Sequence, residues 1–64
     1  MRWIVKLSDG WWLEQCRGGY SPATTDIQAR AERFWSRENA DLALRICRCF
    51  APYPDGAVQE VRDK

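Results

Sequence analysis

The residues of this chain best suited to chemistry are three cysteines, at positions 16, 47 and 49, in a sequence that contains no histidine. Cys47 and Cys49 are two residues apart, and on a helix such positions face roughly opposite sides, so both thiolates cannot reach one ion. Cys16 would add only a third ligand, whereas structural zinc sites usually have four Cys or His ligands. We therefore predict no metal site and no cofactor, and we expect Cys47 to be a small core residue.

The sequence also offers few residues suited to acid–base catalysis or to nucleotide binding. Without histidine, a general base would have to be a carboxylate, a lysine or a tyrosine. Most carboxylates lie among arginines in the sequence, which stabilises their ordinary charged form. Gly18-Gly19 lacks the Lys-Ser/Thr that follows in a phosphate-binding loop. We predict no catalytic residues and no enzymatic activity.

Length and charge limit the remaining function classes. The chain has 64 residues, which predicts a single domain spanning residues 1–64 that is too small to enclose a substrate cavity. Its net charge is +1, and the charges are balanced along the sequence. Proteins that bind duplex DNA usually show a clear basic excess, so we expect no direct binding to nucleic acid.

The odd number of cysteines argues against a secreted, disulfide-stapled domain. No apolar run approaches the length of a signal-peptide core or a membrane span. These features predict a cytoplasmic protein that does not bind membranes.

An N-terminal β-hairpin is predicted from residues 2–7 and 11–16, which flank Ser8-Asp9-Gly10. A two-residue loop would place Glu14 on the apolar face, where a buried carboxylate is costly. A three-residue loop with Gly10 in the left-handed conformation avoids this cost. It pairs Leu7 with Trp11, Val5 with Leu13 and Trp3 with Gln15. One face then carries Trp3, Val5, Leu7, Trp11 and Leu13, and the other carries Ile4, Lys6, Trp12 and Glu14.

The remaining elements follow from periodicity. Residues 26–34 alternate like a strand but also fit one helical face; we favour a strand, because a third strand stabilises a hairpin. A helix with Ser36 as its N-cap comes next, and Pro52 and Pro54 end it. Trp35 is expected to pack near Ala40 at the helix start. The expected buried stripe is Ala40, Ala43, Leu44, Cys47 and Phe50, widened by Leu42 and Ile46. Asp41 and Arg45 are expected to pair, and residues 57–61 to form a last strand.

Together these elements predict an α+β fold of order β-β-β-α-β, in which a small antiparallel sheet packs on one helix. One helix covers one face of a sheet, so Trp12 would remain uncovered on the other face. An exposed tryptophan beside basic residues is typical of an interface hot spot. The predicted partner-binding residues are Trp12, Ile4, Lys6, Glu14 and Tyr20. Alternatively, the stems of Lys6 and Glu14 cover Trp12, or this face closes a homodimer.

Residues 3–14 (Trp-Ile-Val-Lys-Leu-Ser-Asp-Gly-Trp-Trp-Leu-Glu) resemble the start of short open reading frames of phages and bacterial mobile elements. Ala31-Glu32-Arg33-Phe34 before a capped helix containing Ala40 resembles them too. Proteins from such loci include anti-CRISPR proteins. The resemblance implies the same strand–strand–strand–helix–strand order, which supports a strand at residues 27–34. It carries no motif that identifies a functional site.

By this resemblance, the expected function is that of a small inhibitor in the host bacterial cytoplasm. It would bind a host protein complex, a CRISPR effector, and block target-DNA binding or nuclease recruitment as a monomer or homodimer. One alternative is a structural homodimer. Another is a nucleic-acid-binding accessory protein that uses Arg30, Arg33, Arg37, Arg45 and Arg48.

Overall fold

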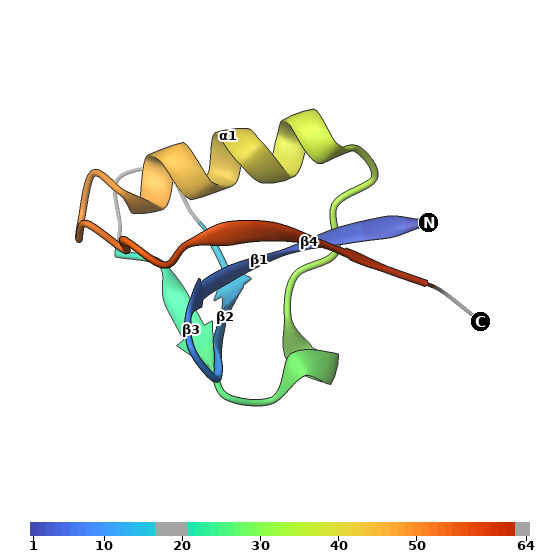
Figure 1. The fold of residues 1–64 in the computed structure, drawn as a ribbon, viewed down its shortest axis with the longest axis horizontal. Coiled ribbons are helices and arrows are strands. Elements are labelled where there is room, and N and C mark those ends of the chain that lie inside the picture. Colours follow the sequence, from blue (N-terminus) through green and yellow to red (C-terminus); the bar gives the residue numbers. More distant parts are fainter. Residues whose placement is uncertain (17–20, 63–64) are drawn as a thin grey trace.

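The computed structural model describes residues 1–16 and 21–62 as a four-stranded antiparallel sheet and one α-helix (Figure 1). The strand order in the sheet is β3-β2-β1-β4. The elements are β1 (Arg2–Ser8), β2 (Trp11–Gln15), β3 (Ala23–Thr25), the 3-10 helix η1 (Gln28–Arg30), α1 (Arg37–Cys47) and β4 (Ala57–Val61). The predicted α+β fold of order β-β-β-α-β is confirmed, and the last strand has the predicted bounds.

The turn of the hairpin is bulged, as predicted, but the predicted pairing of Leu7 with Trp11 is wrong, because Ser8 extends β1 and lies opposite Trp11. Lys6 lies opposite Trp12, and a bulge then places Ser8 opposite Trp11, with Asp9 and Gly10 as the turn. Gly10 has a φ of 77°, in the left-handed region that a glycine adopts without steric cost. This register places Lys6 and Trp12 on one face of the sheet, as the argument from Glu14 required.

Further along β1, the predicted pairing of Trp3 with Gln15 is wrong, because Trp3 pairs with Phe34. Trp3 N donates to Phe34 O at 2.9 Å, and Phe34 N donates to Trp3 O at 2.8 Å. Glu32 N donates to Leu13 O of β2 at 2.9 Å. Residues 32–34 therefore bond to both strands of the hairpin.

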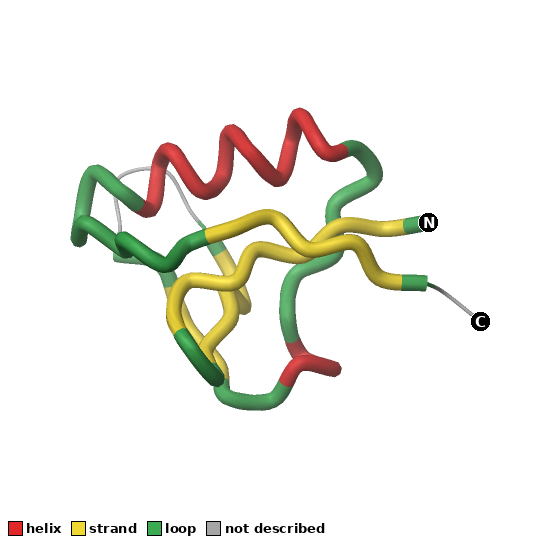
Figure 2. Tube along the Cα trace, viewed as in Figure 1, coloured by secondary structure: helices red, strands yellow, loops and turns green. Residues whose placement is uncertain are grey.

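The predicted strand at residues 26–34 is also wrong. The third strand is the shorter β3, which pairs with β2, and residues 28–30 form η1. The hydroxyl of Thr25 accepts a hydrogen bond from Ile27 N at 3.1 Å, a local contact of the kind that competes with a continuing strand. The chain therefore turns after β3, and η1 lies on the side of the sheet opposite to α1 (Figures 1 and 2).

Helix α1 begins where it was predicted. Ser36 is the N-cap, and its hydroxyl accepts a hydrogen bond from Asn39 N at 3.1 Å. The helix ends at Cys47, so Phe50 lies beyond it and is 45% exposed. The predicted Asp41–Arg45 pair is replaced by Arg37–Asp41, with 4.0 Å between Arg37 Nε and Asp41 Oδ2.

The main core lies between α1 and the sheet. Its buried side chains come from the predicted stripe of α1 and from one face of the hairpin: Ala40, Ala43, Leu44, Cys47, Val5, Leu7 and Leu13. Trp3 packs partly buried against this core, whereas Trp11, predicted on the same face, is 46% exposed at the bulge. Leu42 and Ile46 lie outside the buried stripe, at 56% and 38% exposed. The buried stripe of α1 is therefore narrower than predicted.

Candidate functional site

The predicted binding surface on the far face of the hairpin is largely covered. Ile4 is 1% exposed, so its assignment as a partner-binding residue is wrong. Ala31 is also buried, and neither residue belongs to the core beneath α1. The connection through η1 lies on this side of the sheet, which the argument from a single helix overlooked (Figure 1).

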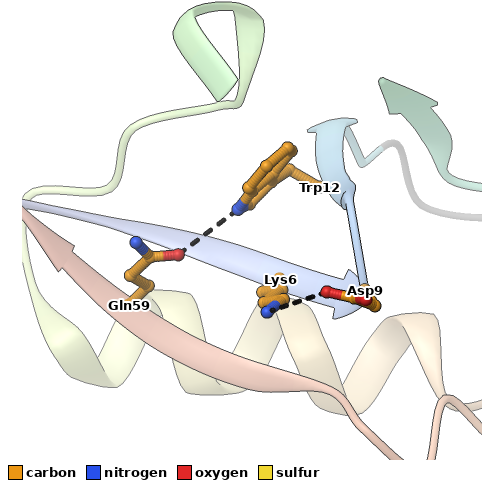
Figure 3. A network of polar contacts seen from close by, with 4 residues as sticks. All are labelled: Lys6, Asp9, Trp12 and Gln59. Atoms are coloured by element: carbon orange, nitrogen blue, oxygen red, sulfur yellow. Dashed lines mark hydrogen bonds and ion pairs between the residues drawn. The ribbon is translucent and has the colours of Figure 1, made fainter. Parts of the chain in front are cut away.

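Trp12 lies on this same side, away from α1 (Figure 3). It is partly buried, and its Nε1 donates a hydrogen bond of 3.3 Å to Oε1 of Gln59 on β4. Its neighbour across the β2–β3 pair is Thr25, which is buried. The indole therefore links β2 to β4 across the sheet, and a structural role accounts for its position.

Lys6 and Glu14 remain partly accessible, and each has an ion-pair partner. Lys6 Nζ lies 3.8 Å from Asp9 Oδ1, and Arg30 Nε of η1 lies 4.0 Å from Glu14 Oε1. Exposed pairs at such distances contribute about 0–1 kcal/mol each. Tyr20, the fifth predicted residue, lies outside the described residues.

The exposed apolar side chains of α1 border a groove instead. One wall is formed by α1 and the other by the end of β2 and residues 32–34. Its volume is about 330 Å³, and it is lined by Cys16, Glu32, Phe34, Asn39, Leu42, Ala43 and Ile46. We call the space between these residues the groove.

Local structure explains how the groove forms. Leu42 and Ile46 are four residues apart, so they lie on the same flank of α1, beside the buried Ala43. Glu32 and Phe34 are two residues apart in extended chain, so they share a side of it. The hydrogen bonds of Glu32 N to Leu13 O and of Phe34 to Trp3 hold this wall in place.

Sequence reasoning missed the groove for two reasons. It counted Leu42 and Ile46 as part of the buried stripe, and it placed residues 32–34 in a regular strand. A signal was present, because Leu42 and Ile46 lie at the edge of the helical stripe that Ala40, Ala43, Leu44 and Cys47 define. That position is typical of side chains flanking a helix–sheet contact.

Two titratable groups near the groove are perturbed. Partial burial raises the pKa of the Glu32 carboxyl above its ordinary value of 4.5. No Lys or Arg of the described residues lies within ion-pair distance of this carboxylate. Burial, and then the neighbouring Cys16 thiol, raises the pKa of Cys47 to about 11. Cys47 is fully buried, as predicted for a core residue, and Cys49 is exposed.

A second aromatic group lies near the start of α1. The Arg2 guanidinium lies 3.3 Å from the ring centroid of Trp35, and the Arg37 guanidinium lies 5.9 Å from that of Trp3. Trp35 is 75% exposed, so the expected packing against Ala40 is wrong, and the indole stacks on Arg2.

Within residues 1–16 and 21–62, no three or more Cys, Asp or Glu side chains come together in a way that could hold a metal ion. No helix in the same part of the chain has the length and apolar character needed to cross a membrane. Comparisons with protein-family models, curated proteins and solved structures found no match to this chain.

Proposed function

We propose that this chain is a non-enzymatic binding protein that docks a partner protein in the groove. The observation that carries the proposal is the exposure of Leu42 and Ile46 beside an apolar groove. Leaving large aliphatic side chains in water forgoes up to about 1.5–3 kcal/mol each, which a partner could recover by covering them. A helix flank and an adjacent wall form the kind of concave, apolar surface that peptide segments recognise.

The specific function we propose is inhibition of a host protein complex, a CRISPR effector. The protein would act in the bacterial cytoplasm and block target-DNA binding or nuclease recruitment, as anti-CRISPR proteins do. The resemblance of residues 3–14 and 31–34 to phage and mobile-element reading frames supports this proposal. A small chain with an exposed apolar groove is also suited to occluding a larger surface.

Charge reversal of the apolar rim tests the proposal. Leu42→Glu and Ile46→Glu would place a carboxylate at the groove, whereas Ile27→Glu alters a side chain of similar exposure at 49%, near η1 and outside the groove. We expect the first two variants to lose capture of purified CRISPR effector complexes and protection in a plasmid-interference assay. The Ile27→Glu protein should retain both. Equal behaviour of all three variants would contradict the proposal.

Self-association is measured first, because a homodimer would also cover Leu42 and Ile46. We expect light scattering of the wild-type protein to give the mass of a monomer, close to 7.5 kDa. A dimer that Leu42→Glu dissociates would instead assign the groove to an interface between two copies.

The Arg2–Trp35 stack favours a second candidate function, binding of single-stranded nucleic acid. An exposed indole beside guanidinium groups is a common stacking platform for bases. Two of the arginines proposed for this role, Arg30 and Arg37, lie beside carboxylates at 4.0 Å, which reduces the positive potential they offer. Affinity for a labelled single-stranded oligonucleotide that falls steeply with salt, and that Trp35→Ala removes, would support this alternative.

A further inference from the structure

The groove contains one charged residue among neutral neighbours. Among the residues that the structure describes, Glu32 is the only Asp, Glu, Lys or Arg that lines it, and the rest of the lining is Cys16, Phe34, Asn39, Leu42, Ala43 and Ile46. The Glu32 carboxylate has lost part of its hydration, and none of the described residues pairs with it. The described lining of the groove is therefore uncharged except for the Glu32 carboxylate on one wall.

We propose that the groove binds an arginine side chain of the partner protein, with the guanidinium on Glu32 and the aliphatic stem along Leu42 and Ile46. This inference rests on the proposed function, because it names the chemical group that the same groove recognises. Arginine combines a flexible apolar stem with a charged end, which matches a groove that offers both apolar side chains and one carboxylate.

The dimensions of the groove support an amino-acid side chain as the occupant. Its volume of about 330 Å³ lies at the lower end of the range for sites that hold free drug-sized ligands, and it is open on one side. A ligand attached to a larger body suits such an open site, because the remainder of the partner can cover Leu42 and Ile46.

The Glu32 carboxylate favours arginine over other side chains as the occupant of the groove. A guanidinium can bind both oxygens of Glu32 at once, whereas a lysine ammonium acts as a point charge. An acidic side chain would be repelled, and a purely apolar one would leave the carboxylate desolvated and unpaired. Pairing also favours the ionised carboxylate, so binding should weaken as acid protonates Glu32.

A matched pair of peptides tests the proposal. The probes are the blocked peptide acetyl-Ala-Leu-Arg-Leu-Ala-amide and the same peptide with citrulline, the neutral isostere of arginine, in place of arginine. Binding is followed by amide chemical shifts in two-dimensional NMR with the wild-type protein, Glu32→Gln, and the control Glu60→Gln. The control makes the same change of charge at an exposed position of β4.

With the wild-type protein and with Glu60→Gln, we expect the arginine peptide to bind on the order of fivefold more tightly than the citrulline peptide, as for a partly exposed ion pair. With Glu32→Gln the two peptides should bind equally. Shifts should centre on Glu32, Leu42 and Ile46. Equal affinity of the two peptides for the wild-type protein, or no shift at these residues at millimolar peptide, would overturn the inference.

Partner capture separates this inference from the proposed function. If Leu42→Glu abolishes capture and Glu32→Gln leaves it unchanged, the groove docks a partner but arginine recognition is wrong. If Leu42→Glu leaves capture unchanged, the proposed function itself fails, whatever the peptides do.

Discussion

The backbones of Trp3 and Phe34 exchange two hydrogen bonds, of 2.9 and 2.8 Å, although Trp3 belongs to the first strand and Phe34 to the connection before α1. This bridge fixes the point where the chain passes from η1, on one side of the sheet, to α1 on the other (Figure 2). It also places Phe34 and Glu32 on the wall of the groove. The candidate site therefore depends on a pairing between segments far apart in the sequence.

The side chain of Phe34 should contribute strongly to stability, because it packs against the core beneath α1. We expect Phe34→Ala to lower the free energy of unfolding by about 2–3 kcal/mol, below the usual range for a fully buried phenylalanine. Urea denaturation measures the change. Trp35→Ala is the control, since Trp35 is 75% exposed and its stack on Arg2 contributes less than about 1 kcal/mol. A larger loss for Trp35→Ala than for Phe34→Ala would show that the packing described here is wrong.

Gly56 has no room for a side chain. A Cβ at this position would lie 2.9 Å from Leu44 Cδ1 and 3.0 Å from the Tyr53 carbonyl oxygen. The second contact is with backbone, in a turn closed by a hydrogen bond from Gly56 N to Tyr53 O at 2.9 Å. We expect Gly56→Ala to destabilise the fold by about 1–3 kcal/mol, measured as a lower midpoint of urea unfolding. An unchanged midpoint would mean that the turn before β4 can shift without cost.

Glu32 should make stability depend on pH. Its raised pKa means that the folded protein binds a proton more tightly than the unfolded chain does. Stability is therefore lost as the pH rises from the ordinary value of 4.5 through the higher folded pKa, and the loss persists at neutral pH. Glu32→Gln should be more stable than the wild type at pH 7, and this difference should shrink below about pH 4.

Urea unfolding at a series of pH values measures this difference in stability. Glu60→Gln is the control, because it removes the same charge at an exposed position. A Glu32→Gln protein that is less stable than the wild type at pH 7 would contradict the prediction. It would indicate that the ionised carboxylate makes a favourable contact in the folded protein.

The three cysteines should differ in reactivity. Cys47 is fully buried and its pKa is raised to about 11, so little thiolate forms at neutral pH and reagents have no access to it. Cys49 is exposed and Cys16 is partly buried. Alkylation with iodoacetamide at pH 7.5, followed by peptide mass spectrometry, should modify Cys49 first and Cys47 only after unfolding in urea. Modification of Cys47 in the folded protein at a rate similar to that of Cys49 would contradict the burial described here.

Local sequence signals were enough to predict several elements. Asp9-Gly10 and the cost of burying Glu14 predicted the register at Lys6 and Trp12. Ser36 and the spacing of Ala40, Ala43, Leu44 and Cys47 predicted the start and the buried face of α1. Each of these signals acts within one element or across one turn, where the backbone geometry is fixed by neighbouring residues.

The course of residues 26–34 was decided only by the tertiary structure. The alternation of Ile27, Ala29 and Ala31 fits a strand. In the structure, however, the chain turns after Thr25, and residues 28–30 form η1 on the face of the sheet that α1 does not cover. Ile4 became buried there, and Phe34 then paired with Trp3. Burial of apolar surface is non-directional, so the sequence of a short segment cannot say which distant surface it will cover.

The sequence by itself determined the class of fold, the order of its strands and helix, and the buried residues Ala40, Ala43, Leu44 and Cys47 of α1, because these follow from short-range periodicity and capping. The tertiary structure decided that Trp12 bonds to Gln59 and that Leu42, Ile46 and Glu32 share a groove. Those residues come from segments whose relative position depends on packing across the sheet, which no local pattern encodes.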